Sequence, residues 1–227
     1  MKNWAGVATF LAVSILLFPS IATANKNLSD YVAVRGIGGF AAVDNISENA
    51  SGPLTENNTD DFVGGLELVL GYDWLEKGLP FRTEISYHHR FRFDFDTRIN
   101  DGVAGDGFEN NLSTDVVLVN FFYDINLGPK WMPFVGIGVG WARNTSDVVR
   151  TPLIAGPSEE RTDTSDNLAW AAGIGVVYRV SDTWRLEFAY RYIDLGTVEM
   201  GPYNNGTVIE ADDHVSHDIV LGLQFRF

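Results

Sequence analysis

The chain has 227 residues, no cysteine and a formal net charge of −14, from 30 acidic and 16 basic residues. The lack of cysteine excludes disulfides, thiol catalysis and cysteine-based metal sites. The excess of acidic over basic residues argues against a nucleic-acid partner, because binding the phosphate backbone requires a basic protein surface. A chain of this length forms one sizeable domain or two small ones.

The first residues differ in composition from the rest of the chain. Lys2 supplies a positive charge, Val7–Phe18 is almost continuously apolar, and Ala22–Ala24 provides small residues for cleavage. This pattern predicts a secretory signal peptide over residues 1–24 and a single domain over residues 25–227. A membrane anchor is the alternative, but the apolar run is shorter than the roughly 20 residues of a spanning helix.

Eight later segments are rich in β-branched residues, aromatic residues and glycine, and several alternate between apolar and polar positions. A period of two is that of a β-strand, whose successive side chains point to opposite faces. None of these segments has a helical period. The predicted strands are Tyr31–Ala41, Phe62–Tyr72, Phe81–Asp96, Leu112–Asp124, Pro133–Arg143, Asn167–Arg179, Trp184–Tyr192 and His217–Phe227.

The connections between these segments alternate in length. The short turns are Asp73–Pro80, Ile125–Met132 and Val180–Thr183, and the long polar regions are 43–61, 96–111, 144–166 and 194–216. Long loops at every second connection lie together at one end of an up-and-down sheet, which is the anatomy of an outer-membrane barrel. We therefore predict an all-β fold, an eight-stranded antiparallel up-and-down transmembrane β-barrel with both termini in the periplasm.

Strand parity divides the side chains into two sets. When the charged parity of each strand is placed inward, no Asp, Glu, Lys or Arg remains in the outward set, as contact with lipid requires. The inward charges must then pair with one another, because side chains fill an eight-stranded barrel. The predicted network comprises Arg35, Glu67, Arg82, Glu84, Arg90, Arg92, Arg179, Arg185, Glu187, Arg191 and Arg226.

Small inward residues are predicted to make room for this network. Gly136, Gly138 and Gly173 have the inward parity of their strands, and we expect them to leave space for arginines of Phe81–Asp96 and Trp184–Tyr192. The same glycines raise the alternative that a narrow channel for small solutes or ions runs beside the arginines.

Five tryptophans mark the ends of the predicted strands. Trp74, Trp131 and Trp184 lie at the three short turns, whereas Trp141 and Trp170 lie at the opposite strand ends. Indole rings at both ends of the strands predict the two aromatic girdles of a transmembrane barrel.

The sequence offers only weak candidates for catalysis. His214 and Ser216, with Asp212 or Asp218 as the acid, could form the His–Ser pair of a lipid-modifying barrel hydrolase. No oxyanion-hole signature accompanies them, and a polar loop that enters the last strand is the preferred interpretation. His89 faces outward between aromatic residues and is interpreted as an interfacial side chain.

Two acidic stretches are candidates for a divalent cation, since hard cations prefer carboxylate oxygens. They are Asp60-Asp61 and Asp212-Asp213-His214. Neither has the ordered spacing of a dedicated calcium loop, and solvated acidic loops are the preferred interpretation. We therefore expect no enzyme activity, no cofactor and no metal site.

Three stretches, "PFVGIGVGWA", "AAGIGVVYRVSDTWRLEFAYRYIDLG" and "HDIVLGLQFRF", resemble the outer-membrane β-barrel family of opacity-type and OmpA/OmpX-like surface proteins of Gram-negative bacteria. The resemblance spans Tyr31–Phe227. It implies that the chain acts as a surface antigen, an adhesin, a host-interaction protein or a structural envelope protein, since most members of this family have no enzyme activity. It also implies that Leu223, Phe225 and Phe227 form the signal that the barrel-assembly machinery recognises.

The preferred hypothesis is a monomeric, non-enzymatic surface protein that acts in envelope structure, or in contact with host or environment through four acidic loops. Its expected partners are outer-membrane lipid, lipopolysaccharide, the assembly machinery and a possible host or surface ligand. A narrow channel is the alternative, and a lipid-modifying enzyme using His214, Ser216 or His89 is the least favoured.

Overall fold

The structure is a computed structural model that describes residues 29–48, 54–57, 60–100, 105–152, 158–203, 206 and 208–227. The predicted signal peptide lies outside these ranges. In the described part of the chain, no helix has both the length and the apolar character needed to cross a membrane.

Ten strands and one short 3-10 helix make up the described regular structure. In chain order they are β1 (Asp30–Glu48), β2 (Leu54–Asn57), β3 (Asp60–Asp73), η2 (Trp74–Lys77), β4 (Phe81–Asn100), β5 (Gly105–Asp124), β6 (Trp131–Pro152), β7 (Glu159–Arg179), β8 (Trp184–Asp194), β9 (Val198–Met200) and β10 (Ile209–Arg226).

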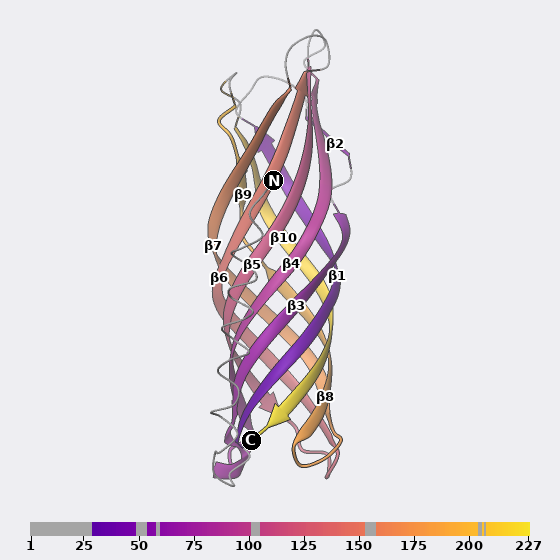
Figure 1. Cartoon of the computed structure of the whole chain (residues 1–227), viewed down its shortest axis with the longest axis vertical. Coiled ribbons are helices and arrows are strands. Elements are labelled where there is room, and N and C mark those ends of the chain that lie inside the picture. Colours follow the sequence, from indigo (N-terminus) through magenta and orange to yellow (C-terminus); the bar gives the residue numbers. More distant parts are fainter. Residues whose placement is uncertain are drawn as a thin grey trace, which may run out of the picture.

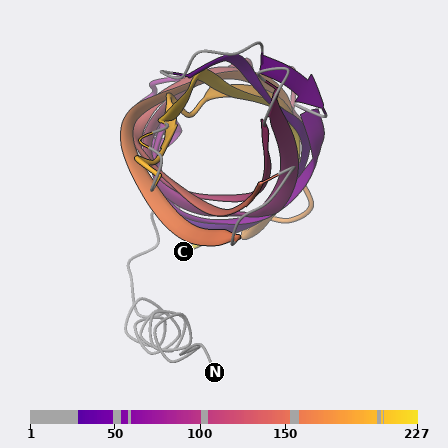
Figure 2. The same ribbon diagram turned by 90° about the horizontal axis from the view of Figure 1, so that it is seen from above.

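Eight of these strands close into an antiparallel ring in the order β1-β3-β4-β5-β6-β7-β8-β10. The ring closes through β1 and β10, which pair from Tyr31 opposite Arg226 to Glu48 opposite Ile209. Figure 1 shows the barrel from the side, with its strands tilted relative to the long axis, and Figure 2 shows the closed ring from above. The short strands β2 and β9 lie outside this order and pair with β4 and β10. The predicted eight-stranded barrel is confirmed.

The strands run much further than the sequence predicted. β4 and β5 remain paired as far as Asn100 opposite Gly105, and β6 and β7 as far as Arg150 opposite Glu159. The prediction of long loops at 43–61, 96–111 and 144–166 was therefore wrong, whereas much of 194–216 is a connection between β8 and β10. Beyond the lipid, outward side chains face water, so the apolar alternation that revealed the strands stops while the strands continue.

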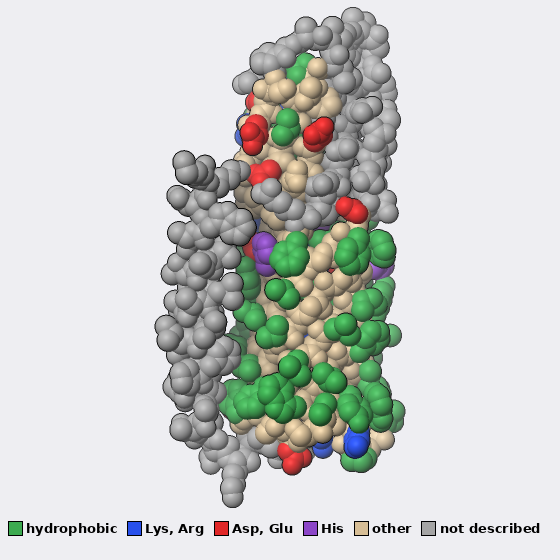
Figure 3. All heavy atoms as spheres, turned by 45° about the vertical axis from the view of Figure 1, so that its right-hand side comes forward, with side chains coloured by type: hydrophobic (Ala, Val, Ile, Leu, Met, Phe, Trp, Pro, Cys, Tyr) green, Lys and Arg blue, Asp and Glu red, His purple; other side chains and the backbone are tan. Residues whose placement is uncertain are grey.

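The outward face has the predicted parity. On β3, Leu66, Leu68 and Leu70 are exposed, whereas Glu67 and Val69 between them are buried. On the face that Figure 3 shows, apolar side chains form a band over the end of the barrel that carries the short turns, and mostly polar side chains lie beyond it. We call the part of the barrel within this band the membrane half. The outer half is the part beyond Trp141 on β6 and Trp170 on β7.

Candidate functional site

Arg35 of β1 lies at the centre of the interior of the membrane half. Its guanidinium donates to Glu67 Oε1 at 3.2 Å, to Glu84 Oε2 and Oε1 at 2.8 Å each, and to Glu187 Oε2 at 2.9 Å. Glu84 also accepts a 2.5 Å hydrogen bond from the Tyr31 hydroxyl, and Gln224 donates to Glu187. Because these residues come from β1, β3, β4, β8 and β10, the cluster around this one buried cation ties together five of the eight strands of the ring.

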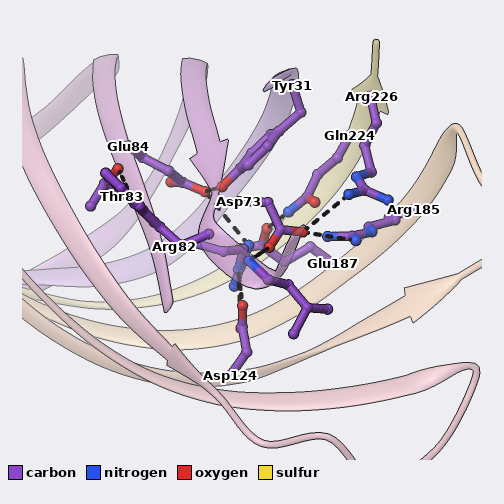
Figure 4. Close-up of polar contacts among 12 residues, drawn as sticks. Tyr31, Asp73, Arg82, Thr83, Glu84, Asp124, Arg185, Glu187, Gln224 and Arg226 are labelled. Atoms are coloured by element: carbon purple, nitrogen blue, oxygen red, sulfur yellow. Dashed lines mark hydrogen bonds and ion pairs between the residues drawn. The ribbon is translucent and has the colours of Figure 1, made fainter. Parts of the chain in front are cut away.

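A second cluster closes the interior at the turn end (Figure 4). Asp73 Oδ2 accepts from Arg185 at 2.9 Å and from Arg226 at 3.4 Å, and Arg82 Nε donates to Asp124 Oδ2 at 2.8 Å. Asp73 is also the N-cap of η2, where its Oδ1 accepts from the Leu75 amide at 3.0 Å. The residue that begins the turn therefore also anchors two interior arginines.

A third layer lies toward the outer half. Arg90 donates to both carboxylate oxygens of Asp218 at 2.9 and 3.0 Å and to the Ser216 hydroxyl at 2.5 Å. Arg191 joins this layer to the central one, since it donates to Asp218 at 3.1 Å and to Glu67 at 2.9 Å. Planar guanidinium groups suit such multiple contacts with carboxylates.

The described interior is balanced in charge. Its six arginines and six carboxylates are Arg35, Arg82, Arg90, Arg185, Arg191 and Arg226, and Glu67, Asp73, Glu84, Asp124, Glu187 and Asp218. Buried charges are tolerated when they are paired and hydrogen-bonded. The network therefore adds no net charge to the interior.

Not every predicted network residue is part of it. Arg179 lies half-buried at the end of β7, where no described carboxylate forms an ion pair with it, and the side chain of Arg92 lies outside the described residues. Sequence reasoning missed Asp73, which was assigned to a turn. Its parity with Glu67 along β3 was the signal that could have placed it inside the barrel.

The interior glycines Gly136 and Gly138 make room for side chains of a neighbouring strand. The prediction that they leave space for arginines was therefore wrong. A Cβ atom at Gly136 would lie 2.2 Å from the ring of Phe122, and one at Gly138 would lie 2.3 Å from Asn120 Oδ1. Phe122 and Phe134 fill the space and stack on the guanidinium of Arg82, at 5.0 and 4.9 Å from their ring centres. The cavity beside Arg35, Glu67 and the glycines is about 40 Å³, which holds only water-sized molecules.

The outer half has a different interior. Its buried cluster is apolar and consists of Ala41, Val63, Leu112, Val148, Val198, Met200, Tyr203, Ile209 and Ala211. Three of these belong to the segment 195–203, which connects β8 to β10 through β9 and packs inside the wall. The outer half therefore has a core of its own, like a soluble β-protein.

Polar side chains hold the segment 195–203 against β7. Asn167 both donates to the Thr197 carbonyl at 2.8 Å and accepts from the Thr197 amide at 3.2 Å. Ser165 accepts from the amide of Glu199 at 3.0 Å, and Asp163 accepts from that of Gly201 at 2.9 Å. Every second side chain of β7 thus bonds every second backbone unit of the segment. We call this arrangement the β7 ladder.

The catalytic candidates are not arranged for lipid chemistry. Ser216 donates to Asp218 at 2.7 Å and accepts from Arg90, and His214 Nδ1 lies 3.2 Å from Asn144 Oδ1. His214 and Ser216 are both buried inside the barrel, away from the lipid. His89 lies outside, 2.8 Å from Asp115.

The cation candidates are also separated. Asp212 is exposed, whereas His214 points into the barrel. Asp61 is exposed, and the side chain of Asp60 lies outside the described residues. In the part of the chain that the structure describes, no three His, Cys, Asp or Glu side chains are grouped to hold a metal ion.

The five tryptophans lie where the two ends of the apolar band meet polar groups. At the turn end, Trp74 Nε1 donates to Thr83 at 3.1 Å, and the rings of Trp131 and Trp184 pack on Tyr178 and Phe225. At the other end, Trp141 and Trp170 are exposed, and Trp170 Nε1 donates to Asp194 at 3.1 Å.

The closing residues of the chain also face outward. Leu223 and Phe225 are exposed on β10, and the ring of Phe227 stacks on Phe225 with 6.4 Å between their centres. Their proposed recognition by the assembly machinery stays a prediction.

A closed ring, a lipid-facing band and a charged interior define an outer-membrane β-barrel. The chain belongs to the outer membrane protein beta-barrel domain family, whose model matches residues 8–227, and it is a bacterial outer-membrane protein. It is similar to the outer membrane protein PagN of Salmonella typhimurium, with 28% identity over 246 residues that cover 100% of both chains.

Solved structures share the fold at low identity. A major outer membrane protein from Thermus thermophilus has a TM-score of 0.54 at 14% identity, over 88% of this chain and 100% of that chain. Neisserial surface protein A has a TM-score of 0.53 at 16% identity, over 87% of this chain and 97% of that chain.

Proposed function

We propose that this protein is a non-enzymatic surface protein whose outer half contacts molecules or surfaces outside the cell. The observation that carries the proposal is the separate apolar core of the outer half. A barrel that only spanned lipid would need no such core, because the charged network and the apolar residues beside it already fill its membrane half. A rigid outer half with a polar exterior is suited to presenting a defined surface.

The interior supports this role over the alternative of a channel. Three layers of ion pairs and the apolar residues packed beside them, such as Phe134 and Val220, fill the membrane half. The apolar cluster with the segment 195–203 fills the outer half. The cavity of about 40 Å³ beside Arg35 has no room for a hydrated solute. The buried positions of His214 and Ser216 likewise favour a structural role over lipid hydrolysis.

A trimmed variant tests the proposal. It lacks residues 93–112 and 144–165, with each hairpin closed by a short turn, so the membrane half keeps its strands. Bacteria that display the full chain should adhere to host cells or matrix-coated surfaces above a vector control, and bacteria with the trimmed variant should not. Heat-dependent gel mobility checks that the trimmed barrel still folds. Equal adhesion by both proteins would contradict the proposal.

A further inference from the structure

The barrel wall is incomplete in the outer half, along one edge of β7. β6 pairs with β7 over its whole length, but β8 covers only the stretch from Trp170 opposite Asp194 to Arg179 opposite Arg185. Residues 159–169 therefore have no strand partner on their second edge within the described part of the chain. In an antiparallel strand, the backbone groups of alternate residues point toward each edge, so half of the groups in this stretch face no strand.

The nearest strand does not fill this position. β9 pairs with β10, from Ile209 opposite Met200 to Ala211 opposite Val198. Its contacts with β7 go through the β7 ladder, whose side chains have the inward parity of β7. β9 consequently lies on the inner side of β7 and leaves the edge itself open.

A cleft of about 420 Å³ follows this edge. Its lining includes five consecutive β7 residues, 163–167, and on the other side Thr197, Glu199, Gly201 and Glu210. Successive side chains of a strand point to opposite faces, so a cleft lined by consecutive residues runs along the backbone edge. Its volume is within the range of about 300–1,000 Å³ that is usual for ligand sites.

The charges around the cleft define the partner that it would accept. Asp163 and Asp166 pair with Arg161 and Arg143, but Glu160, Glu199 and Glu210 form no ion pair with the described residues. Glu199 and Glu210 lie directly opposite each other on β9 and β10, and both are exposed. Like charges in directly opposite positions destabilise a strand pair, so a cation placed between them would be favoured.

We propose that the β7 edge binds an extended segment of a partner protein that carries lysine or arginine at alternate positions. The segment would add to residues 159–169 as a further strand, through backbone hydrogen bonds, with its basic side chains near Glu160, Glu199 and Glu210. The exposed acids would also repel a second acidic edge, so they select against self-association. This inference rests on the proposed surface role and names the partner class and the site.

Hydrogen exchange on the full chain in detergent micelles tests the site. The probe is a short synthetic peptide of alternating lysine and threonine. A fully N-methylated version keeps every charge, but its methyl groups remove the backbone donors and block the close approach of a neighbouring strand, so it cannot pair with the edge. We expect the first peptide to slow amide exchange in residues 159–169 by at least about tenfold at saturation, and the second to leave it unchanged. Absence of protection, or equal protection by both peptides, would overturn the proposal.

Charge variants test the specificity of the cleft. Changing Glu199→Gln together with Glu210→Gln should weaken binding of the unmodified peptide about tenfold. The matched control, Glu109→Gln with Asp61→Asn, removes the same charge at exposed positions of β5 and β3, away from the cleft, and should change binding less than about threefold. Equal weakening by both pairs would mean a non-specific acidic surface and would refute the site.

Two further outcomes separate this proposal from its alternatives. In the absence of peptide, the protection of residues 159–169 could increase with protein concentration. That result would assign the edge to a second copy of the chain and overturn the proposal. In the adhesion assay, loss with the trimmed variant but not with Glu199→Gln and Glu210→Gln would leave the surface role intact and refute only the peptide site. Loss of adhesion with the trimmed variant and also with the Glu199→Gln and Glu210→Gln variant would support the surface role and the peptide site.

Discussion

The strand β10 faces opposite environments along its length. In the membrane half, Ile219 and Leu221 face outward while Asp218 faces the interior. In the outer half, Glu210 faces outward while Ile209 faces the interior. The apolar residues keep the odd positions in both halves, but the face to which odd positions point changes at Asp212 and Asp213, which are both exposed. Lipid outside requires an apolar exterior and leaves polar groups inside, whereas water outside allows an apolar core.

The two interiors also differ in what a lost side chain costs. Removing one ion from a buried network leaves its partners uncompensated, which costs about 3–5 kcal/mol. Removing methyl groups from an apolar core leaves a cavity, at about 2–5 kcal/mol for a large-to-alanine change. The first loss should weaken the whole ring and the second only the outer half.

Arg35→Met should have the largest effect, because it leaves Glu67, Glu84 and Glu187 without their shared cation. We expect a loss of about 3–5 kcal/mol in the free energy of unfolding, measured by urea unfolding in detergent micelles. Arg143→Met is the matched control, since Arg143 pairs with Asp166 in an exposed position, and it should change stability little. Similar stability of the two variants would mean that the network does not hold the membrane half together.

Ile209→Ala should weaken the outer half alone. Ile209 is 1% exposed within the apolar cluster, so its truncation should lower the local opening free energy by about 2–5 kcal/mol. Amide exchange in residues 195–211 reports this loss, while heat-dependent gel mobility should stay that of the folded barrel. Ile219→Ala on the lipid-facing side of the same strand should leave that exchange unchanged. A collapse of the whole barrel in Ile209→Ala would show that the halves are not independent.

The sequence predicted the membrane half well for a physical reason. Lipid excludes charge from every outward position, so the period of two persists across the ring and fixes both strand and face. Strand pairing then brings residues distant in sequence, such as Arg35 and Glu187, to hydrogen-bonding distance. The exact partners could not be predicted, because they depend on the stagger between strands.

The strands of the outer half could not be predicted from the sequence, because neither their inward nor their outward positions are restricted to one type of residue. Its inward residues include both Val148 and Asn144, which are buried in the same strand, and its outward residues include the exposed Leu168 beside the polar Thr164 and Asp166. The segment 195–203 was interpreted as loop because its apolar residues are too few to mark a strand. What holds it is the β7 ladder, whose Asn, Ser and Asp side chains are typical of loops in sequence.

Asn167→Ala should loosen the β7 ladder by a moderate amount. Asn167 makes two hydrogen bonds with Thr197, and each such bond contributes about 0.5–1.5 kcal/mol. Exchange of the Thr197 amide should therefore accelerate by about tenfold, while the membrane half is unaffected. Thr164→Ala, on the exposed face of the same strand, is the matched control and should leave this amide unchanged. Equal rates in both variants would mean that the apolar cluster alone holds the segment.

Arg143→Gln should have the smallest effect on stability. Arg143 Nε lies 2.8 Å from Asp166 Oδ1, and both groups are exposed beyond the apolar band. The guanidinium lowers the pKa of Asp166, mainly through this hydrogen bond. A lowered carboxyl pKa stabilises the folded state above the ordinary pKa, and this contribution is lost as the pH falls through the lowered value.

In Arg143→Gln the pKa of Asp166 should therefore rise toward its ordinary value, as an NMR titration of the carboxyl carbon would show. Stability at neutral pH should change little, because solvent screens an exposed pair. An unchanged pKa would mean that the pair does not form in solution. A large loss of stability would mean that exposed charges in the outer half carry as much of the fold as Arg35 does in the membrane half, and the contrast between the two interiors would then fail.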